Sequence, residues 1–506
     1  MAECWYLLMT LLILPLLFIF HLRKKKTHKK VEKTRKPPGP GGLPLIGNLH
    51  QLDGANPHES LRNLSNKYGP LVSLRFGNVP VVVISSAKAA KEALKTHDLA
   101  FSARPRRVSN QKLSYNGLDL AFSPYGEYWR EVKKVCVSQI FSPKRVQSFR
   151  PILEDEVSLL INEISHQEAA VINLSSMALN FTNMLICRIA YGKKFDKESH
   201  TKKRFDQNLH QIEAFLGGYF VADYFPSLGW IDKLLGTSSL LDKNFKDLDS
   251  FYQQLIEEHL DPNRPPDSAE SDLLDILIQI KSDPSSSLQL TWDHVKAILT
   301  NMFVAGTNTN SAVIIWAMTA LIKAPTIMKR VQAEIRNSVG EKGEIGEEVL
   351  QQLPYLDAAI KETLRLYPPG VILPRETMKS CSIQGYDIQA KSTILINVWA
   401  ISRDPESWKD PEEFNPDRFL NSDVDVKGND FELIPFGSGR RGCPGMYLGL
   451  LIVKVTLANL LYSFDWELPS GVTVQDIDTQ MSPGLILHKK TPLCLLPKKF
   501  TWSGCK

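Results

Sequence analysis

The sequence predicts a mainly helical α+β domain preceded by one N-terminal transmembrane helix. Three features support this fold class: an apolar run at the N-terminus, a pair of β-branched runs early in the chain, and helical patterns through most of the remainder, with short strands near the end. The chain has 506 residues, of which 43% are hydrophobic, so it can bury a sizeable core. Disordered and fibrous classes are therefore excluded.

Residues 4–22 form the predicted membrane anchor. They contain no Lys, Arg, Asp or Glu, and as a helix they would be roughly 28 Å long, enough to cross a bilayer. Four basic residues (23–26) follow the run, whereas a signal peptide has its positive charge before the run. We expect a retained anchor with the rest of the chain in the cytosol. A cleaved signal peptide is the alternative.

Residues 23–49 are expected to be a basic and proline-rich linker, followed by one folded catalytic domain over 50–506. Residues 23–36 carry nine Lys or Arg against one acid, Glu32, which favours contact with anionic lipid headgroups and not with nucleic acid. A simple topology signal is the alternative. Prolines and glycines in KPPGPGGLPLIGNL (36–49) predict a semi-rigid arm or an ordinary linker.

A β-hairpin is expected at the start of the folded domain. In GPLVSLRFGNVPVVVIS (69–85), Gly77 and Asn78 separate two β-branched runs.

One long helix is expected from Thr291 to Lys323. Thr291 is the expected N-cap and Pro325 follows the last turn. The second half is apolar on nearly all sides, which is typical of a helix buried through the middle of a protein. A second membrane span is the alternative, although the asparagines in this segment would be costly in lipid.

Seven cysteines are scattered along the chain without a CxxC pair, so neither a disulfide framework nor a zinc knuckle is favoured. One of them lies in PFGSGRRGCPGMYLG (435–449). This segment fits the pattern FxxGxRxCxG at Phe436, Gly439, Arg441, Cys443 and Gly445. Chance would produce the pattern in roughly one chain in ten thousand of this length. The spacing therefore favours a functional cysteine over a structural one.

A single thiolate can bind an iron whose other ligands come from a macrocycle. Glycines let the backbone approach a flat cofactor and direct N–H groups at the sulfur. Arg441 is expected to bind a propionate of that cofactor, and Phe436 to shield the sulfur from water. The loop thus predicts a haem site in which Cys443 is the axial ligand of the iron.

With this loop, the chain resembles the cytochrome P-450 family of haem-thiolate monooxygenases, in its membrane-anchored plant microsomal A-type group, over essentially its whole length. The segment KETLRLYPP places Glu362 and Arg365 three residues apart, on one helix face. In the family this pair joins an arginine, matched here by Arg418 of NPDRF, and supports the loop behind the haem. The resemblance implies the cytochrome P-450 fold, a helical domain with a small β-rich part.

The resemblance implies haem b as the cofactor and assigns three further residues to its propionates. These are Trp129 and Lys133 of YWREVKK and Arg375 of LPRET. The family usually has an arginine where this chain has Lys133, and the lysine keeps the charge but loses the bidentate fork.

Electrons are expected to come from outside the chain, because GPGGLPLIG follows no strand and opens no helix and so fails as a dinucleotide site. By resemblance the donor is NADPH-cytochrome P-450 reductase, a separate flavin protein, with a b-type cytochrome as a second candidate. The reductase would dock on a basic face that includes Lys133, Lys134, Arg440 and Arg441. A simply solvated charged face is the alternative for the exposed members.

The segment AGTNTN (305–310) matches the family's oxygen-binding stretch, in which Gly306 opens a groove beside the haem. Thr309 falls on the hydroxyl position of the family's proton relay, whereas Asn308 replaces its carboxylate and Asn310 the next Ser or Thr. An amide cannot give up and regain a proton near neutral pH, so it can only orient water. Three interpretations remain: a water chain with ordinary monooxygenation, an altered oxygen chemistry, or a purely packing role.

The expected function is insertion of one oxygen atom of O2 into a small apolar plant specialised metabolite, of terpenoid, alkaloid, phenylpropanoid or aldoxime type. Alternatives are a haem-thiolate enzyme for dehydration, rearrangement or coupling, and a haem protein that binds a ligand without turnover. By resemblance, one span anchors the protein in the endoplasmic reticulum membrane. Membrane lipid is an expected partner and nucleic acid is not.

The segments that line the family's substrate pocket contribute eight apolar side chains here. Such a lining suits an apolar or aromatic compound. The eight side chains are Phe220, Phe225, Phe303, Val371, Ile372, Leu373, Leu485 and Ile486.

Overall fold

The structure, a computed structural model, describes residues 35–192, 200–264, 271–285, 288–482 and 484–502. The predicted membrane anchor and the first twelve residues of the linker (23–34) lie outside these ranges.

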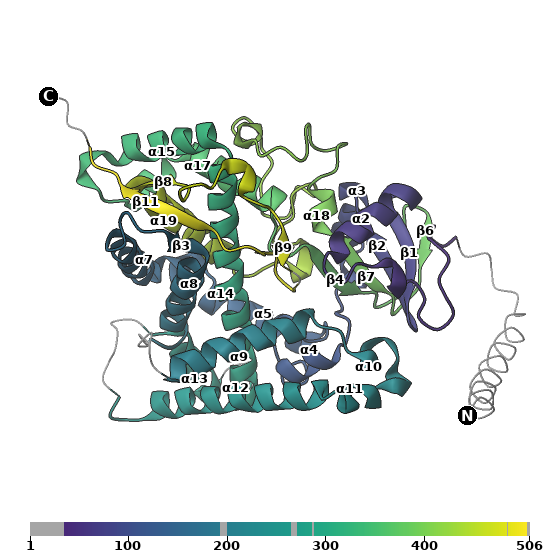
Figure 1. Ribbon diagram of the computed structural model, residues 1–506. Helices are drawn as coiled ribbons and strands as arrows, with labels where there is room; N and C mark the ends of the chain where they lie inside the picture. The colour runs from purple at the N-terminus through teal and green to yellow at the C-terminus, as the bar shows by residue number, and fades with distance from the viewer. Residues whose placement is uncertain (1–34, 193–199, 265–270, 286–287, 483, 503–506) are drawn as a thin grey trace, which may run out of the picture.

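Most of the described chain is helical, and the helices form the larger part of the molecule in Figure 1. The mainly α (α+β) prediction is therefore confirmed. The helices are α2 (Pro57–Tyr68), α3 (Ala87–Lys91), α4 (Val108–Leu113), α5 (Glu127–Val135), α6 (Pro143–Ser148), α7 (Arg150–Ser165), α8 (Leu174–Tyr191), α9 (His200–Gly217), α10 (Val221–Tyr224), α11 (Trp230–Leu234), α12 (Thr237–Leu260), α13 (Leu273–Ser282), α14 (Trp292–Lys323), α15 (Pro325–Val339), α16 (Glu347–Gln351), α17 (Pro354–Leu366), α18 (Val398–Ile401) and α19 (Met446–Ser463). Short 3-10 and π segments connect several of them.

The largest sheet forms a smaller part, at the right of Figure 1 together with α2 and α3. The strands are β1 (Leu71–Phe76), β2 (Val79–Ile84), β3 (Ile172–Asn173), β4 (Ile372–Glu376), β5 (Cys381–Ile383), β6 (Tyr386–Ile388), β7 (Thr393–Asn397), β8 (Phe464–Glu467), β9 (Met481–Ser482), β10 (His488–Lys489) and β11 (Cys494–Lys499). The largest sheet has the order β1-β2-β7-β4. Strands β3, β11 and β8 pair within the helical part, on the left of Figure 1.

The predicted hairpin is confirmed. Phe76 pairs with Val79 across the turn, so Gly77 and Asn78 are its two turn residues. Gly77 has a φ of +56°, a conformation that a residue with a Cβ adopts only at a cost.

The described part of the linker packs against this hairpin. The N–H of Ser73 donates to Pro38 O at 2.8 Å, and a Cβ on Gly39 would lie 2.0 Å from Ser73 O. Residues 38–48 therefore lie directly on β1, which supports a semi-rigid arm.

Helix α14 runs through the middle of the helical part (Figure 1). Thr291 caps it in a capping box with His294, as its position in the sequence predicts. Nearly every residue from Val295 onward is buried, and α8, α17 and α19 surround the helix. Burial inside the protein thus explains its apolar composition. Pro325 begins α15, which turns away at 115°.

Helix α19 begins three residues after Cys443. Within the described ranges it is long and apolar enough by itself to cross a membrane, and half of its apolar window is buried inside the domain. It packs against α7, α14 and α15, so its composition is that of a core helix.

Candidate functional site

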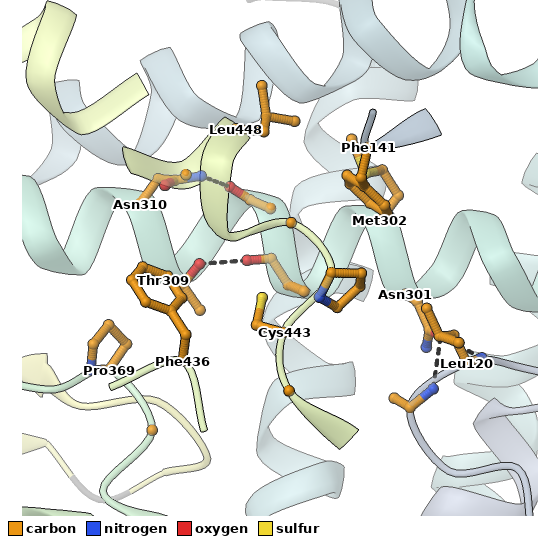
Figure 2. Close-up of a pocket in the computed structure, with 18 of the residues that line it drawn as sticks. Leu120, Phe141, Asn301, Met302, Thr309, Asn310, Pro369, Phe436, Cys443 and Leu448 are labelled. Atoms are coloured by element: carbon orange, nitrogen blue, oxygen red, sulfur yellow. Dashed lines mark hydrogen bonds between the residues drawn. The ribbon is translucent and has the colours of Figure 1, made fainter. Parts of the chain in front are cut away.

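A cavity of about 360 Å³ lies between the middle of α14 and the loop that contains Cys443 (Figure 2). Residues 298–313 of α14 form one side and residues 435–453 the other. Residues of α5, the π segment after it (Cys136–Ile140), the loop 120–121 and the turn 369–373 also contribute to the lining, which is mostly apolar. An apolar cavity with a few converging polar groups is the usual form of a small-molecule site.

Cys443 presents its thiol to this cavity. Its side chain points from the loop into the space, across from α14 (Figure 2), so the surface that it exposes is cavity wall. Burial raises the pKa of the Cys443 thiol, while the N–H of Gly445 and the charge of Lys133 act to lower it. A metal ligand must be a thiolate, so these two groups are the ones that favour ligation.

Backbone geometry holds the loop in this position. The N–H of Cys443 donates to Phe436 O at 2.9 Å. Gly437 and Gly439 have φ values of +70° and +71°, and a Cβ on Gly439 would lie 2.5 Å from Leu94 O. Gly437 and Gly439 are therefore required by the fold of the loop. Phe436 lines the cavity and packs on the core.

Behind the loop, the predicted charged triad is present. The Arg365 guanidinium donates to both carboxylate oxygens of Glu362, at 2.7 and 2.9 Å, and Arg418 donates to the same carboxylate at 3.0 Å. Glu362 and Arg365 are 0% exposed. Arg365 also donates to the carbonyl oxygens of Ser402 and Pro411 at 2.8 and 2.7 Å. The triad thus ties α17 to the segment before the cysteine loop.

One end of the cavity has a group of cations, which we call the cationic wall: Arg104, Lys133, Arg375 and Arg441. All but Arg375 are in direct contact with the cavity, and Arg375 is 1% exposed on β4. Burial lowers the pKa of Arg104 to about 10. Burial and the neighbouring Arg104 lower that of Arg441 to about 9, and burial with both arginines lowers that of Arg375 well below its ordinary value.

Guanidinium groups remain protonated in proteins, so these shifts mean that buried positive charge is short of compensating negative charge. Asp98 and Asp119 are the acids that oppose the shifts. Two carboxylates arriving with a ligand would supply what is missing. The Cys443 thiol, facing an apolar cavity with a cationic end, therefore fits a haem, which carries an iron and two propionates.

The structure brings the predicted propionate residues together, with their donors directed largely at backbone carbonyls. Trp129 Nε1 donates to Leu120 O at 2.9 Å, and Lys133 Nζ donates to Arg440 O. The three guanidinium nitrogens of Arg441 donate to three carbonyl oxygens at 2.6–3.3 Å, and its charge lies 4.1 Å from the centre of the Trp129 ring. Arg375 is different, because among the described residues it donates only to Pro374 O, at 3.1 Å.

Two residues of this region were missed from the sequence. Arg104 donates to Ala121 O and Pro374 O at 3.1 and 2.5 Å, so it joins the loop over the cavity to β4. Asp119 accepts from Asn301 Nδ2 at 2.8 Å, and burial raises the pKa of its carboxyl group to about 6. Neither lies in a local motif.

Asn301 fixes the loop across the cavity. Its Oδ1 accepts from the N–H groups of Leu120 and Ala121 at 2.9 and 3.1 Å. The amide is thereby committed to the protein itself (Figure 2).

On α14, Thr309 and Asn310 line the cavity and Asn308 does not. Thr309 Oγ1 donates to Ala305 O at 2.5 Å, and Asn310 Nδ2 donates to Gly306 O at 2.7 Å (Figure 2). Asn308 is 5% exposed, and its Nδ2 donates to Glu213 Oε2 at 2.9 Å.

Gly306 lines the cavity and also lets two helices approach each other. A Cβ there would lie 2.7 Å from Ile186 Cδ1 of α8.

The predicted apolar lining is wrong in most of its members. Of the eight side chains, only Leu373 lines the cavity. Phe303 is fully buried and stacks on Tyr191 at 4.8 Å, and Phe220 is 1% exposed in the core. The pocket is instead lined from α14, the loop 120–121, α5 and the turn 369–373.

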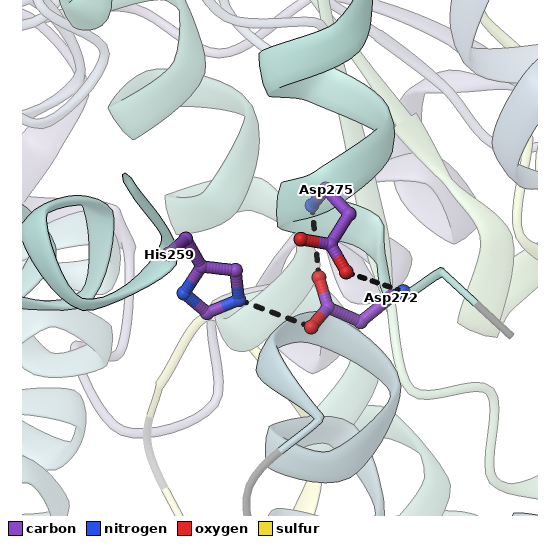
Figure 3. Close-up of side chains that lie close together, drawn as sticks. All are labelled: His259, Asp272 and Asp275. Atoms are coloured by element: carbon purple, nitrogen blue, oxygen red, sulfur yellow. Dashed lines mark hydrogen bonds and ion pairs between the residues drawn. The ribbon is translucent and has the colours of Figure 1, made fainter. Parts of the chain in front are cut away.

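A second group of potential ligands lies at the start of α13 (Figure 3): His259, Asp272 and Asp275. The two aspartates form the capping box of α13. Arg264 donates to both of them, at 3.0 and 2.9 Å, and His259 lies 3.0 Å from Asp272. The carboxylates thus serve as a helix cap and a salt bridge, and we assign no metal to them.

Known proteins resemble this chain in sequence and in structure. Residues 37–496 match the cytochrome P450 family. Strychnine-11-hydroxylase of Strychnos nux-vomica is 46% identical over 98% of this chain and 97% of its own length. The 6,7,8-trihydroxycoumarin synthase of Pastinaca sativa is 48% identical over 97% of this chain and 98% of its own. A solved zebra fish cytochrome P450 structure with abiraterone has a TM-score of 0.73 and 26% identity, and covers 88% of this chain and 100% of that one.

Proposed function

Because this chain belongs to the cytochrome P450 family, we propose that it hydroxylates a small, largely apolar plant metabolite of alkaloid or coumarin type in the cavity beside Cys443. The chain is a monooxygenase that uses haem b and electrons from NADPH through a reductase. When bound, the haem supplies the redox chemistry by which O2, a substrate C–H bond, NADPH and one proton become a C–OH group, water and NADP⁺. One observation carries the proposal: the Cys443 thiol, with the Gly445 N–H and Lys133 to favour its thiolate, faces an apolar cavity that has a cationic end.

We assign Cys443 as the axial ligand of the haem iron. The loop offers one sulfur, one N–H from Gly445 directed at it, and the charge of Lys133 nearby. Both groups stabilise a thiolate over a thiol. Phe436 lies beside the sulfur in the cavity lining and reduces its contact with water.

We assign the haem propionates to the cationic wall and Trp129. Arg375 is the strongest candidate, because burial and two neighbouring arginines lower its pKa, and it makes a single hydrogen bond to the described residues. Arg441 and Lys133 contribute charge while their bonds to carbonyl oxygens hold them in position.

Replacing Arg375 by methionine is expected to speed haem dissociation roughly 10- to 100-fold, since a hydrogen bond to a charged group contributes about 1.5–3 kcal/mol. Transfer of haem to an excess of an apo-globin, followed by absorbance, measures this rate. Arg330→Met, at an exposed helix position, is the control and should leave it unchanged. Equal rates of haem dissociation for the wild type and Arg375→Met would contradict the assignment of Arg375 to the propionate site.

We assign Thr309 to bind water in the cavity through its hydroxyl group. Its hydroxyl lies in the lining and donates to Ala305 O, so its oxygen stays available to accept a hydrogen bond from water.

The substrate is expected to be selected by shape more than by hydrogen bonds. The polar groups beside the apolar lining are already engaged: Asn301 with the loop 119–121, and Thr309 and Asn310 with carbonyl oxygens of α14. The relatives named for strychnine and for a trihydroxycoumarin support a rigid polycyclic or aromatic compound. No contact of the described residues favours a rearrangement enzyme or a binding protein without turnover.

We propose NADPH-cytochrome P-450 reductase as the electron donor, with a b-type cytochrome as a second donor, and α5 as part of the docking surface. Lys134 is 72% exposed in its side chain, and Arg130 is exposed one turn before it. Arg440 is 46% exposed and pairs with Asp98, whereas Arg441 is buried and belongs to the cavity and not to this surface.

Changing Arg130 and Lys134 together to glutamate is expected to slow electron delivery several-fold at low salt, because opposite charges speed the encounter of two proteins. Stopped-flow reduction with the reductase, at several ionic strengths, measures the effect. It should shrink as salt screens the charges. Lys243→Glu, exposed on α12, should have no effect. A slowdown that is independent of salt would contradict docking at α5.

We further propose that residues 4–22 anchor the protein in the endoplasmic reticulum membrane with the domain 50–506 in the cytosol. The apolar run and the basic residues after it support this topology.

The proposed function is tested by a screen of alkaloids and coumarins with the reductase, NADPH and ¹⁸O2. We expect a product heavier than its substrate by one labelled oxygen atom. Turnover of NADPH without a labelled product from any aromatic or polycyclic compound would contradict the proposed substrate class.

A further inference from the structure

A polar cluster lies on α14 beside the face that lines the cavity: Asn308, Glu213 of α9 and His488 of β10. Asn308 Nδ2 donates to Glu213 Oε2 at 2.9 Å, and His488 Nε2 lies 3.0 Å from Glu213 Oε1. The carboxylate therefore uses one oxygen for the amide and the other for the imidazole. We call these three residues the Glu213 cluster.

The cluster extends from the edge of the cavity toward solvent. Asn308 lies one turn after Ala305, which lines the cavity, and next to Thr309, which also does. Asn308 and Glu213 are 5% and 8% exposed, whereas the side chain of His488 is 31% exposed. The exposed end of the cluster is thus the imidazole, and its carboxyl group is enclosed.

Close packing holds the three elements together. A Cβ on Gly217, at the end of α9, would lie 2.8 Å from Leu485 N, so α9 touches the loop before β10. Trp316 Nε1 of α14 donates to Leu487 O at 2.7 Å, and Leu487 N donates to Pro369 O at 2.9 Å. The preceding residue, Leu487, is therefore tied to α14 and to Pro369, and this holds His488 beside Glu213.

The chemistry of the reaction gives this cluster a use. Turnover consumes protons inside a cavity lined mostly by apolar groups, and Asn308 has no acidic proton to give. A carboxyl group can release and regain a proton, and an imidazole can pass one from solvent. Glu213 is the carboxyl group that contacts Asn308 directly.

We propose that Glu213 provides the acidic group of the proton supply to the cavity, acting through water that Asn308 orients, and that His488 returns protons to it from solvent. This inference rests on the proposed monooxygenase function. Each proton that leaves Glu213 toward the cavity is replaced by one from bulk water through the imidazole, so the cluster is unchanged after each turnover. Glu213 does not touch the cavity and is a positioning and supply residue.

The competing explanation is that the cluster only ties α9 and β10 to α14. The Glu213→Gln variant distinguishes the two explanations. Glutamine has the same shape as glutamate and can still accept the hydrogen bond from Asn308, but it has no acidic proton. The double variant Glu213→Gln with Asn308→Asp reverses the positions of acid and amide. It keeps an amide-to-carboxylate hydrogen bond between the same two helices and restores a carboxyl group next to Thr309.

For Glu213→Gln we expect product formation to fall by roughly 10²-fold, with most NADPH electrons recovered as peroxide and a larger rate ratio between H2O and D2O. Haem content, the unfolding midpoint and the absorbance change on substrate binding should match the wild type. The double variant should recover most of the product yield and the wild-type isotope ratio. These binding and unfolding measurements do not depend on turnover.

Two results would overturn the inference. One is a Glu213→Gln variant that couples NADPH to product as the wild type does, in a preparation whose wild type passes the ¹⁸O2 test; the proposed function would then stand without it. The other is a Glu213→Gln variant with a lowered unfolding midpoint, together with a double variant that does not recover the product yield. The cluster would then only tie the three elements together. Failure of the wild type in the ¹⁸O2 test would instead remove the proposed function.

Discussion

Cys443→Ala is expected to abolish product formation, because it removes the sulfur that we assign to the haem iron. No neighbouring group can replace it. Cys136 is a second thiol in the cavity lining, but burial raises its pKa to about 12 with no opposing group. The Cys443 thiol, by contrast, has the Gly445 N–H and Lys133 to favour its thiolate. Turnover of NADPH to labelled product, measured with the reductase, gives the result directly.

Cys136→Ala is the matched control for this prediction. It removes a thiol from the same cavity, and we expect it to retain haem and most of the activity. If Cys136→Ala lost the haem and Cys443→Ala kept it, the ligand assignment would pass to Cys136.

Arg365→Ala is expected to produce the largest loss of stability. The substitution leaves the fully buried Glu362 carboxylate with Arg418 alone as its charged partner, and leaves the carbonyl oxygens of Ser402 and Pro411 without their donor. Breaking a buried pair by removing one partner costs about 3–5 kcal/mol, against a total free energy of unfolding of about 5–15 kcal/mol. Denaturant unfolding of the haem-loaded protein measures the loss.

Arg330→Ala is the control for the stability prediction. Arg330 pairs with Asp417, next to Arg418 in the chain, but both side chains are about half exposed. Exposed pairs contribute about 0–1 kcal/mol, so its loss should be small. Similar losses for Arg330→Ala and Arg365→Ala would contradict the account of a buried triad.

The parts of the molecule that local sequence determines were predictable. The two-residue turn of the β1–β2 hairpin and the Thr291 cap of α14 depend on neighbouring residues, and both are confirmed. Glu362 and Arg365 are three residues apart on one helix, so their pairing followed from helix geometry. Gly437 and Gly439 likewise have a local cause, namely their positive φ angles.

The parts that tertiary packing determines could not be predicted. Glu213 lies 95 residues before Asn308 and 275 before His488, and no local pattern connects them. Asp119 meets Asn301 from 182 residues away. The predicted apolar lining was wrong because Phe303 and Phe220 are apolar, as the residues of a pocket wall would be, but pack in the core. Periodicity shows that a helix is buried on all sides, and does not show which side meets a cavity.

The central claim is that the sulfur of Cys443 binds the haem iron, and the absorbance of the reduced protein under carbon monoxide tests it most directly. We expect the wild type to give the strongly red-shifted band that a thiolate ligand produces, and Cys443→Ala to lack it while Cys136→Ala retains it. A wild type without this band, or a Cys443→Ala protein with an unchanged one, would contradict the account.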